Sequence, residues 1–242
     1  MKAASNRQGA KRAESCRASL ASLASWRFAL VLLLNGCGGL SHTVERELLS
    51  DITIENKLML FDAENDVSIA VDEREQLLRQ IRDLRQDVDD AHRQMRESDS
   101  DHDRAIEKND QARADLADQA YAVFDKKGDY LEAQLALVRE KLVAQDGLVW
   151  VSLAKYELAK AKLVKRNNVF GASDVEVEAF ELQVEEYIAK AKEAQAALAE
   201  TETQVKAIRD DWLKEREALS QKSGGGVGSP WAEESASWGG WE

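Results

Sequence analysis

Asn167-Asn168-Val169-Phe170-Gly171-Ala172 lies between two segments in which apolar or small side chains recur every seven residues. Neighbouring Asn and Gly residues favour a turn, because both tolerate backbone conformations that other residues avoid. Before the turn, the repeat falls on Tyr121, Gly128, Leu135, Leu142, Val149, Tyr156 and Leu163. After it, the repeat falls on Val177, Val184, Ala191, Leu198, Val205, Trp212 and Leu219, with a second seam at Phe180, Tyr187, Ala194, Thr201 and Ile208. A repeat of this length is typical of a coiled coil, so a turn at 167–173 predicts an antiparallel helical hairpin.

The position of this turn also predicts which residues face each other. Opposed seam residues should have numbers that add up to about 340, as Leu163 and Val177 do. The same register sets Gly128 opposite Trp212, where a missing side chain would accommodate the largest one. Ser173, followed by Glu at the third position after it, has the spacing of a capping box and predicts the start of the last helix.

The preceding part of the chain leaves two alternatives open. A helix is predicted from Val44, and its seam then turns polar at 97–103, where Ser and Asp residues cluster. A turn near 98–103 would give a three-helix up-down-up coiled coil, in which Leu84 meets Leu116 and Val67 meets Leu135. Without that turn, one helix of about 120 residues carries the hairpin at its far end.

Both alternatives are elongated and all-α. They share a coiled-coil domain at 44–220 and a disordered, flexible tail at 221–242 that is rich in Gly, Ser and Trp.

The chain begins with a segment typical of a secretory signal peptide. Residues 1–27 carry six basic residues and one acidic residue, and the apolar run Phe28–Leu34 follows them. This run is too short to cross a bilayer, which takes about 20 residues. It is therefore expected to direct export and not to remain as a transmembrane helix.

Leu34-Asn35-Gly36-Cys37 resembles the lipobox of bacterial lipoproteins. The resemblance implies that residues 1–36 are removed, that Cys37 is lipidated, and that acyl chains such as palmitate anchor it. Residues 37–43 would then be the lipidated N-terminus and a linker. Gly38 stands where Asp retains enteric lipoproteins in the inner membrane, which implies sorting to the outer membrane, facing the periplasm. The alternative is an uncleaved segment with an ordinary thiol at Cys37.

The charge of the chain limits its partners. Loss of residues 1–36 removes six basic residues and one acidic residue and takes the net charge from −12 to −17. We expect no nucleic-acid partner, because such proteins carry a basic stripe. The expected partners are the bilayer, through acylated Cys37, and a protein of the bacterial cell envelope. A homo-oligomer could form through apolar flanks of the hairpin at Leu131, Leu153 and Leu158.

No set of residues predicts catalysis or a cofactor. The acidic segment 99–103 has the spacing of a calcium loop, but Arg104 takes the place of the glycine that the loop needs. His92 and His102 are ten residues apart and do not share a helix face as a zinc pair would. We therefore expect no enzyme activity, no metal site and no cofactor.

Two regions are candidates for protein contacts. Trp231, Trp238 and Trp241 lie in the tail, and Trp is frequent in binding hot spots. Val169 and Phe170 are apolar residues in the hairpin turn. We expect a lipid-anchored periplasmic coiled-coil protein that acts as an envelope spacer, tether or adaptor and holds the tail or the hairpin turn at a distance. The alternative is an accessory or regulatory subunit of an envelope enzyme or transport machine.

Overall fold

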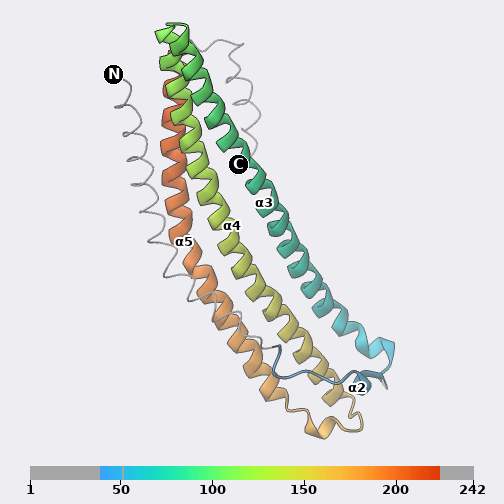
Figure 1. Cartoon of the computed structure of the whole chain (residues 1–242). Helices are drawn as coiled ribbons and strands as arrows, with labels where there is room; N and C mark the ends of the chain where they lie inside the picture. The colour runs from blue at the N-terminus through green and yellow to red at the C-terminus, as the bar shows by residue number, and fades with distance from the viewer. Residues whose placement is uncertain (1–38, 51, 224–242) are drawn as a thin grey trace. The chain divides into compact units, whose positions relative to one another are not determined.

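The computed structural model describes residues 39–50 and 52–223 of a chain that divides into two units, Met1–Thr43 and Val44–Glu242. All helices of the described part belong to the second unit (Figure 1). They are α2 (Arg46–Ser50), α3 (Ile54–Glu107), α4 (Gln111–Arg166) and α5 (Val177–Lys222), with a short 3-10 turn, η1 (Ala172–Asp174), before α5. The described residues contain no strand, so the all-α prediction is confirmed.

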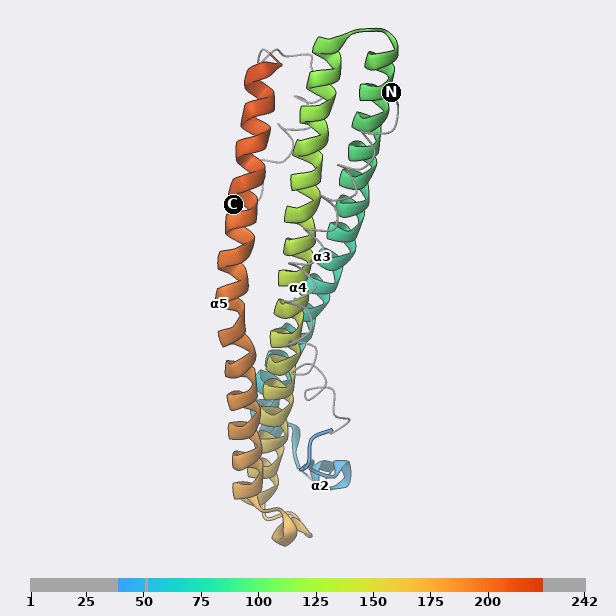
Figure 2. The same cartoon turned by 60° about the vertical axis from the view of Figure 1, so that its left-hand side comes forward.

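Helix α4 forms the centre of this unit. Helices α3 and α5 each pack along α4, whereas they make few contacts with each other. Figure 2 shows α4 between its two neighbours. With 56 residues at 1.5 Å each, α4 is roughly 84 Å long. The structure therefore has the up-down-up order that was one of the two predicted alternatives, and residues 52–223 do not form the single helix of the other alternative.

The predicted register between α4 and α5 is confirmed. Thr201 donates a hydrogen bond to Glu140 over 2.7 Å, and Tyr130 stacks on Trp212 with ring centroids 5.3 Å apart. The residue numbers of these pairs add up to 341 and 342, close to the expected 340. One predicted pair is wrong, however. A Cβ atom on Gly128 would meet the ring of His92 in α3 at 3.6 Å, so Gly128 faces α3 and not Trp212.

The turn between α3 and α4 lies later than expected. Helix α3 continues through 98–103 and ends at Glu107, and the chain turns at 108–110. The predicted pairs of Leu84 with Leu116 and Val67 with Leu135 are therefore wrong. Because the register of an antiparallel pair follows the centre of its turn, a shift of ten residues moves every pair sum by about twenty. The observed contact of Gln94 with Lys127 has the sum 221.

Small side chains explain why α3 does not end at the Ser- and Asp-rich segment. Ala91, Ser98 and Ala105 are spaced seven apart and are at most 1% exposed, so they form a seam that lets the helix backbones approach closely. The Ser98 hydroxyl donates to the carbonyl of Gln94 over 3.0 Å and is satisfied within the helix. Within the segment that reads as polar in the sequence, Ser98 is thus a small residue of the helix interface.

Both helix-to-helix turns start with an Asn in the left-handed region. Asn109 has φ 53° and Asn168 has φ 48°. At the first turn, the Asp110 N–H donates to the Ala105 carbonyl over 2.9 Å, and the Asn109 N–H donates to the Ile106 carbonyl over 3.0 Å. This is the Schellman pattern of helix termination, in which Asn is tolerated because it enters the left-handed region at low cost.

Two predicted helix starts are corrected. The helix expected from Val44 is interrupted, because α2 ends at Ser50 and α3 begins only at Ile54. The break brings Val44 and Ile52 into the same buried cluster. The capping box at Ser173 does not form either, because Ser173 lies within η1 and two extended residues, Val175 and Glu176, precede α5. The N-cap of α5 is Glu176, which makes no side-chain cap hydrogen bond.

Candidate functional site

One end of the helical unit gathers segments from across the sequence. The first residues of the unit, the start of α3, the end of α4, the α4–α5 loop and the start of α5 share one apolar cluster. Its buried members are Val44, Ile52, Leu60, Ala161, Leu163, Val164, Ala172 and Phe180. We call this the Val44 end. The opposite end, here the Asn109 end, holds the α3–α4 turn and the last turns of α5, where Leu219 clusters with Ala120.

A buried carboxylate fixes the point at which the chain enters the unit. The backbone N–H of Val44 donates to Glu157 Oε2 over 2.8 Å, and Lys160 Nζ donates to Glu157 Oε1 over 2.6 Å. The Glu157 and Lys160 side chains are 11% and 15% exposed. Charged hydrogen bonds of this kind are strong when both partners are held away from water. Val44 is therefore firmly attached to the middle helix.

The α4–α5 loop separates the two residues that the sequence singled out as a contact pair. Val169 packs against the core of the Val44 end, whereas Phe170 is 98% exposed. Gly171 has φ 89°, and a Cβ there would lie 3.4 Å from the side chain of Leu48 in α2. The loop is thus held against α2, and of the two apolar residues Phe170 is the one that points outward.

The location of this loop corrects a second expectation. The hairpin turn was expected to be presented at a distance from the start of the helical unit. Instead it lies at the Val44 end, beside the first residues of this unit. The part of the unit farthest from Val44 is the Asn109 end, from which residues 224–242 continue.

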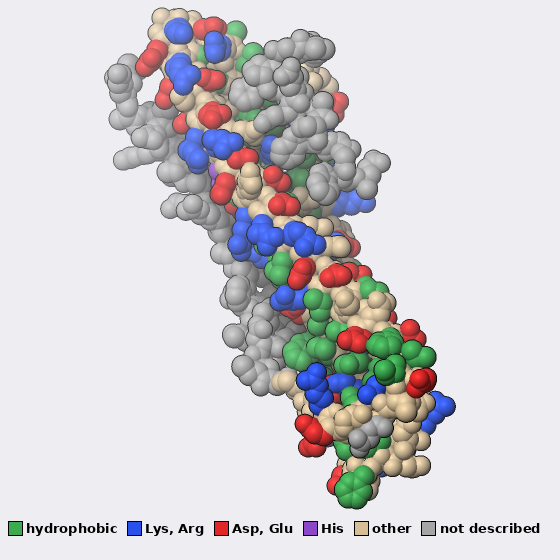
Figure 3. All heavy atoms as spheres, turned by 90° about the vertical axis from the view of Figure 1, so that its right-hand side faces the viewer, with side chains coloured by type: hydrophobic (Ala, Val, Ile, Leu, Met, Phe, Trp, Pro, Cys, Tyr) green, Lys and Arg blue, Asp and Glu red, His purple; other side chains and the backbone are tan. Residues whose placement is uncertain are grey.

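Sequence reasoning missed a row of exposed apolar residues near the start of α3. Ile54, Leu58, Phe61 and Ile69 are between 48% and 72% exposed. Figure 3, which looks at the α3 side, shows hydrophobic side chains gathered towards the Val44 end. The i, i+4, i+7 spacing of the first three residues could have revealed this second face. Met59, in the same part of α3, is 42% exposed.

The flanks that were expected to support self-association are largely covered within the folded unit. Leu131 is 3% exposed, and Leu158 packs against the core cluster. Leu153 is half-buried. These side chains are therefore poor candidates for contact with a second copy.

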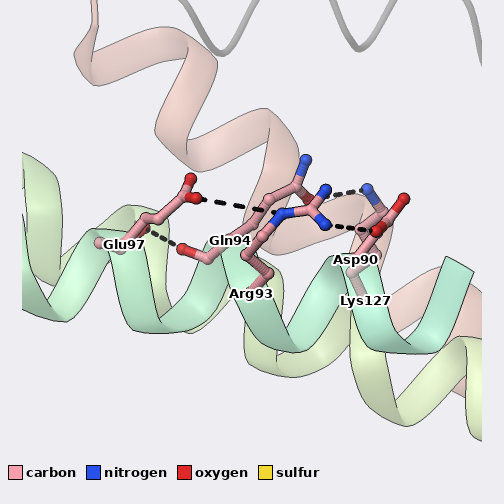
Figure 4. Close-up of polar contacts among 6 residues, drawn as sticks. Asp90, Arg93, Gln94, Glu97 and Lys127 are labelled. Atoms are coloured by element: carbon pink, nitrogen blue, oxygen red, sulfur yellow. Dashed lines mark hydrogen bonds and ion pairs between the residues drawn. The ribbon is translucent and has the colours of Figure 1, made fainter. Parts of the chain in front are cut away.

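A polar contact crosses the α3–α4 interface nearer the Asn109 end (Figure 4). Lys127 is 5% exposed, and its Nζ donates to Gln94 Oε1 over 3.1 Å. The same Nζ lies 5.7 Å from the centre of the Phe124 ring. Burial raises the pKa of the nearby Asp87 carboxyl, and the Lys127 ammonium opposes that shift. A buried polar contact of this kind favours one helix register over others, since a shifted register would leave Lys127 unpaired.

The described residues contain no group of three or more His, Cys, Asp or Glu side chains that could hold a metal ion. The acidic segment 99–103 lies within α3 and forms no loop. In the part of the chain that the structure describes, no helix combines the length and apolar character needed to cross a membrane.

Four of the sequence-predicted site residues lie outside the described residues. They are Cys37, Trp231, Trp238 and Trp241.

Comparisons with protein-family models, curated proteins and solved structures gave no match. The features described above fit contact with other molecules: a firmly held entry point, one outward aromatic residue and an exposed apolar row.

Proposed function

We propose that this protein is a lipid-anchored spacer or tether of the bacterial cell envelope, attached to the outer membrane through Cys37 and facing the periplasm. The basic leader, the short apolar run and Leu34-Asn35-Gly36-Cys37 support the anchor. The helical unit would then separate the membrane from a second contact made by the tail.

The observation that carries this proposal is the placement of the two ends of the described unit. Val44 follows Cys37 by seven residues, which can span at most about 25 Å. The last turn of α5 lies at the opposite end, separated from Val44 by the length of α4, roughly 84 Å. A lipid at Cys37 and a partner on the tail would therefore be held far apart.

The attachment of Val44 to α4 supports a role in transmitting force or setting a distance. The Glu157 carboxylate and the apolar cluster hold the chain immediately after the linker. A pull on the linker would thus be transmitted to α4, which runs the full length of the unit, and not to a loosely attached segment.

Intact mass spectrometry of the protein extracted from membranes tests the anchor. We expect the mass of Cys37–Glu242 plus acyl chains, and loss of the membrane-bound form in Cys37→Ala. The full-length mass with an unmodified Cys37 would refute the anchor.

The tether is tested by cross-linking in intact cells. Simultaneous substitution of Trp231, Trp238 and Trp241 by Ala should remove a cross-linked envelope partner while lipidation continues. Phe170→Ala tests the other candidate contact separately, because Phe170 is an exposed aromatic residue at the opposite end of the unit. An unchanged cross-linking pattern would refute a tail-mediated tether, and a stable stoichiometric complex with an envelope enzyme or transporter would favour the accessory-subunit alternative.

A further inference from the structure

The first third of α3 carries apolar residues on two opposite faces. One face packs on α4 through Leu60 and Ala70, which are both 6% exposed. The other face carries Ile54, Leu58 and Phe61 at i, i+4 and i+7, and Ile69 two turns further on. We call these four residues the α3 stripe. A helix with one partner needs one apolar face, so the second face indicates a further contact.

We propose that the α3 stripe pairs with the same stripe of a second copy of this chain, in parallel orientation. The spacing of the stripe fits a coiled-coil seam in which Leu58 and Asn65 occupy a positions and Ile54 and Phe61 occupy d positions. In parallel two-stranded coiled coils, a single polar Asn at an a position sets register and strand number at some cost in stability.

The charges beside the stripe fit the parallel arrangement. In a parallel pair, a g position faces the e position five residues later on the other helix. Lys57 is at g and Asp62 is at e, so each copy's Lys57 would face the other copy's Asp62, giving two symmetric attractive pairs. The next g-to-e pair joins Glu64 of one copy to Ile69 of the other, and it brings no like charges together. An antiparallel pair centred on the stripe would instead bring the two Asp62 carboxylates together.

The charge at the next seam position limits the pairing to the Val44 end. Asp72 is the a residue after Asn65, and two Asp72 carboxylates at one level would repel each other. The pairing is therefore restricted to about two heptads, which is short for an isolated coiled coil. A weak contact of this kind is strengthened when both chains are confined to one surface.

Membrane attachment would supply that confinement, and this step alone rests on the proposed function. Two copies anchored through Cys37 in one membrane have their Val44 ends at the same height and their α3 helices in parallel. Their stripes are then level with each other and self-complementary, as a two-fold interface requires.

Cysteine cross-linking tests the parallel pair. Asn65→Cys lies in the seam at an a position, and Asp66→Cys is the matched control, since it is the adjacent exposed residue on a different face of α3. In membranes containing the lipidated protein, we expect oxidation to form Asn65→Cys dimers at least tenfold faster than Asp66→Cys dimers. Phe61→Asp in the Asn65→Cys background should abolish this difference, with an unchanged circular dichroism spectrum because Phe61 is exposed.

A second form of the protein separates this proposal from the anchor. The full chain with Cys16→Ser and Cys37→Ser has no other cysteine and no lipid attachment point, so Asn65→Cys can be cross-linked in it at increasing concentration. Preferential dimer formation in this form supports the stripe even where intact mass shows no lipid. Preference in the membrane form alone also supports it and shows that confinement is required.

Three results would overturn the parallel pair. Equal rates for Asn65→Cys and Asp66→Cys in both forms would exclude pairing at the stripe. A preferred mixed disulfide between Leu58→Cys and Asn65→Cys chains would show an antiparallel pair. Cross-linking of Asn65→Cys to a different protein, with no self-dimer, would show that the stripe belongs to another partner.

Discussion

Two glycines of α4, Gly128 and Gly147, should respond differently to replacement by alanine, although the chemical change is the same. Gly128→Ala should raise the free energy of unfolding by about 1 kcal/mol, because Ala is favoured over Gly in a helix by that amount. The new Cβ would meet only the His92 side chain, at an ordinary contact distance of 3.6 Å. The methyl group should therefore fit without moving either helix.

Gly147→Ala introduces the same methyl group at a tighter contact. Its Cβ would lie 3.3 Å from the Ala191 Cα and 3.4 Å from the Ala191 Cβ, which belong to the opposing helix α5. Pushing a packed backbone aside costs about 1–3 kcal/mol, which equals or exceeds the gain in helix propensity. We expect a net change between zero and a loss of about 2 kcal/mol.

Urea unfolding followed by circular dichroism measures both variants. With a slope of about 2–3 kcal/mol per molar urea, Gly128→Ala should move the midpoint up by about 0.3–0.5 M, and Gly147→Ala should leave it unchanged or lower it. Equal slopes for all three proteins are the control that the unfolded state is the same. A loss of stability in Gly128→Ala would show that Gly128 faces a bulky residue such as Trp212 after all, and equal stabilisation by both variants would refute the close approach at Gly147.

Three further substitutions test other parts of the unit. Trp212→Ala should lower the free energy of unfolding by about 3–5 kcal/mol, because Trp212 is 8% exposed. Trp212→Phe should lower it by less than about 1.5 kcal/mol, since it keeps an aromatic ring and removes a buried Nε1 that has no hydrogen-bond partner. Similar urea midpoints for the two variants would contradict this. Glu157→Ala should lower the free energy of unfolding by about 3–5 kcal/mol, because it leaves Lys160 and the Val44 N–H without this carboxylate. An unchanged Tm in thermal unfolding would refute the idea that Glu157 holds the start of the unit on α4. Asp125 is exposed, but partial desolvation and the nearby Asp129 still raise the pKa of its carboxyl, so its ionisation weakens the folded state as pH rises through the folded-state pKa. Asp125→Asn should therefore raise Tm at pH 7 but not at about pH 3, and a pH-independent difference would exclude this cause.

The helices and one turn could be predicted from the sequence because their signals are local. The seven-residue repeat of α5 marks its buried face, and Val184, Ala191, Val205 and Trp212 are indeed buried. The register between α4 and α5 follows from the centre of the turn near Phe170, since residues equally distant from a short turn must lie side by side. Both inferences use spacing alone.

The second turn was misplaced because local polarity is ambiguous. The Ser- and Asp-rich segment at 97–103 has the composition of a cap or turn. In the structure Ser98 is buried, because it is small enough to fit between the closely packed helices α3 and α4. The actual turn at Asn109 depends on a residue in the left-handed region, and a single Asn is only a weak sequence signal for such a turn.

The candidate site depended most on tertiary structure. The sequence by itself determined the all-α composition and the repeats, because both are properties of neighbouring residues. The leader and the lipobox-like motif stay predictions from the sequence. Only the tertiary structure decided that Val169 turns inward while Phe170 turns out, that the hairpin turn lies beside Val44, and that Leu131 is covered while Ile54, Leu58 and Phe61 are not. The exposure of a side chain is set by neighbours that are distant in sequence. The position of a single turn determines which of those neighbours pack against it.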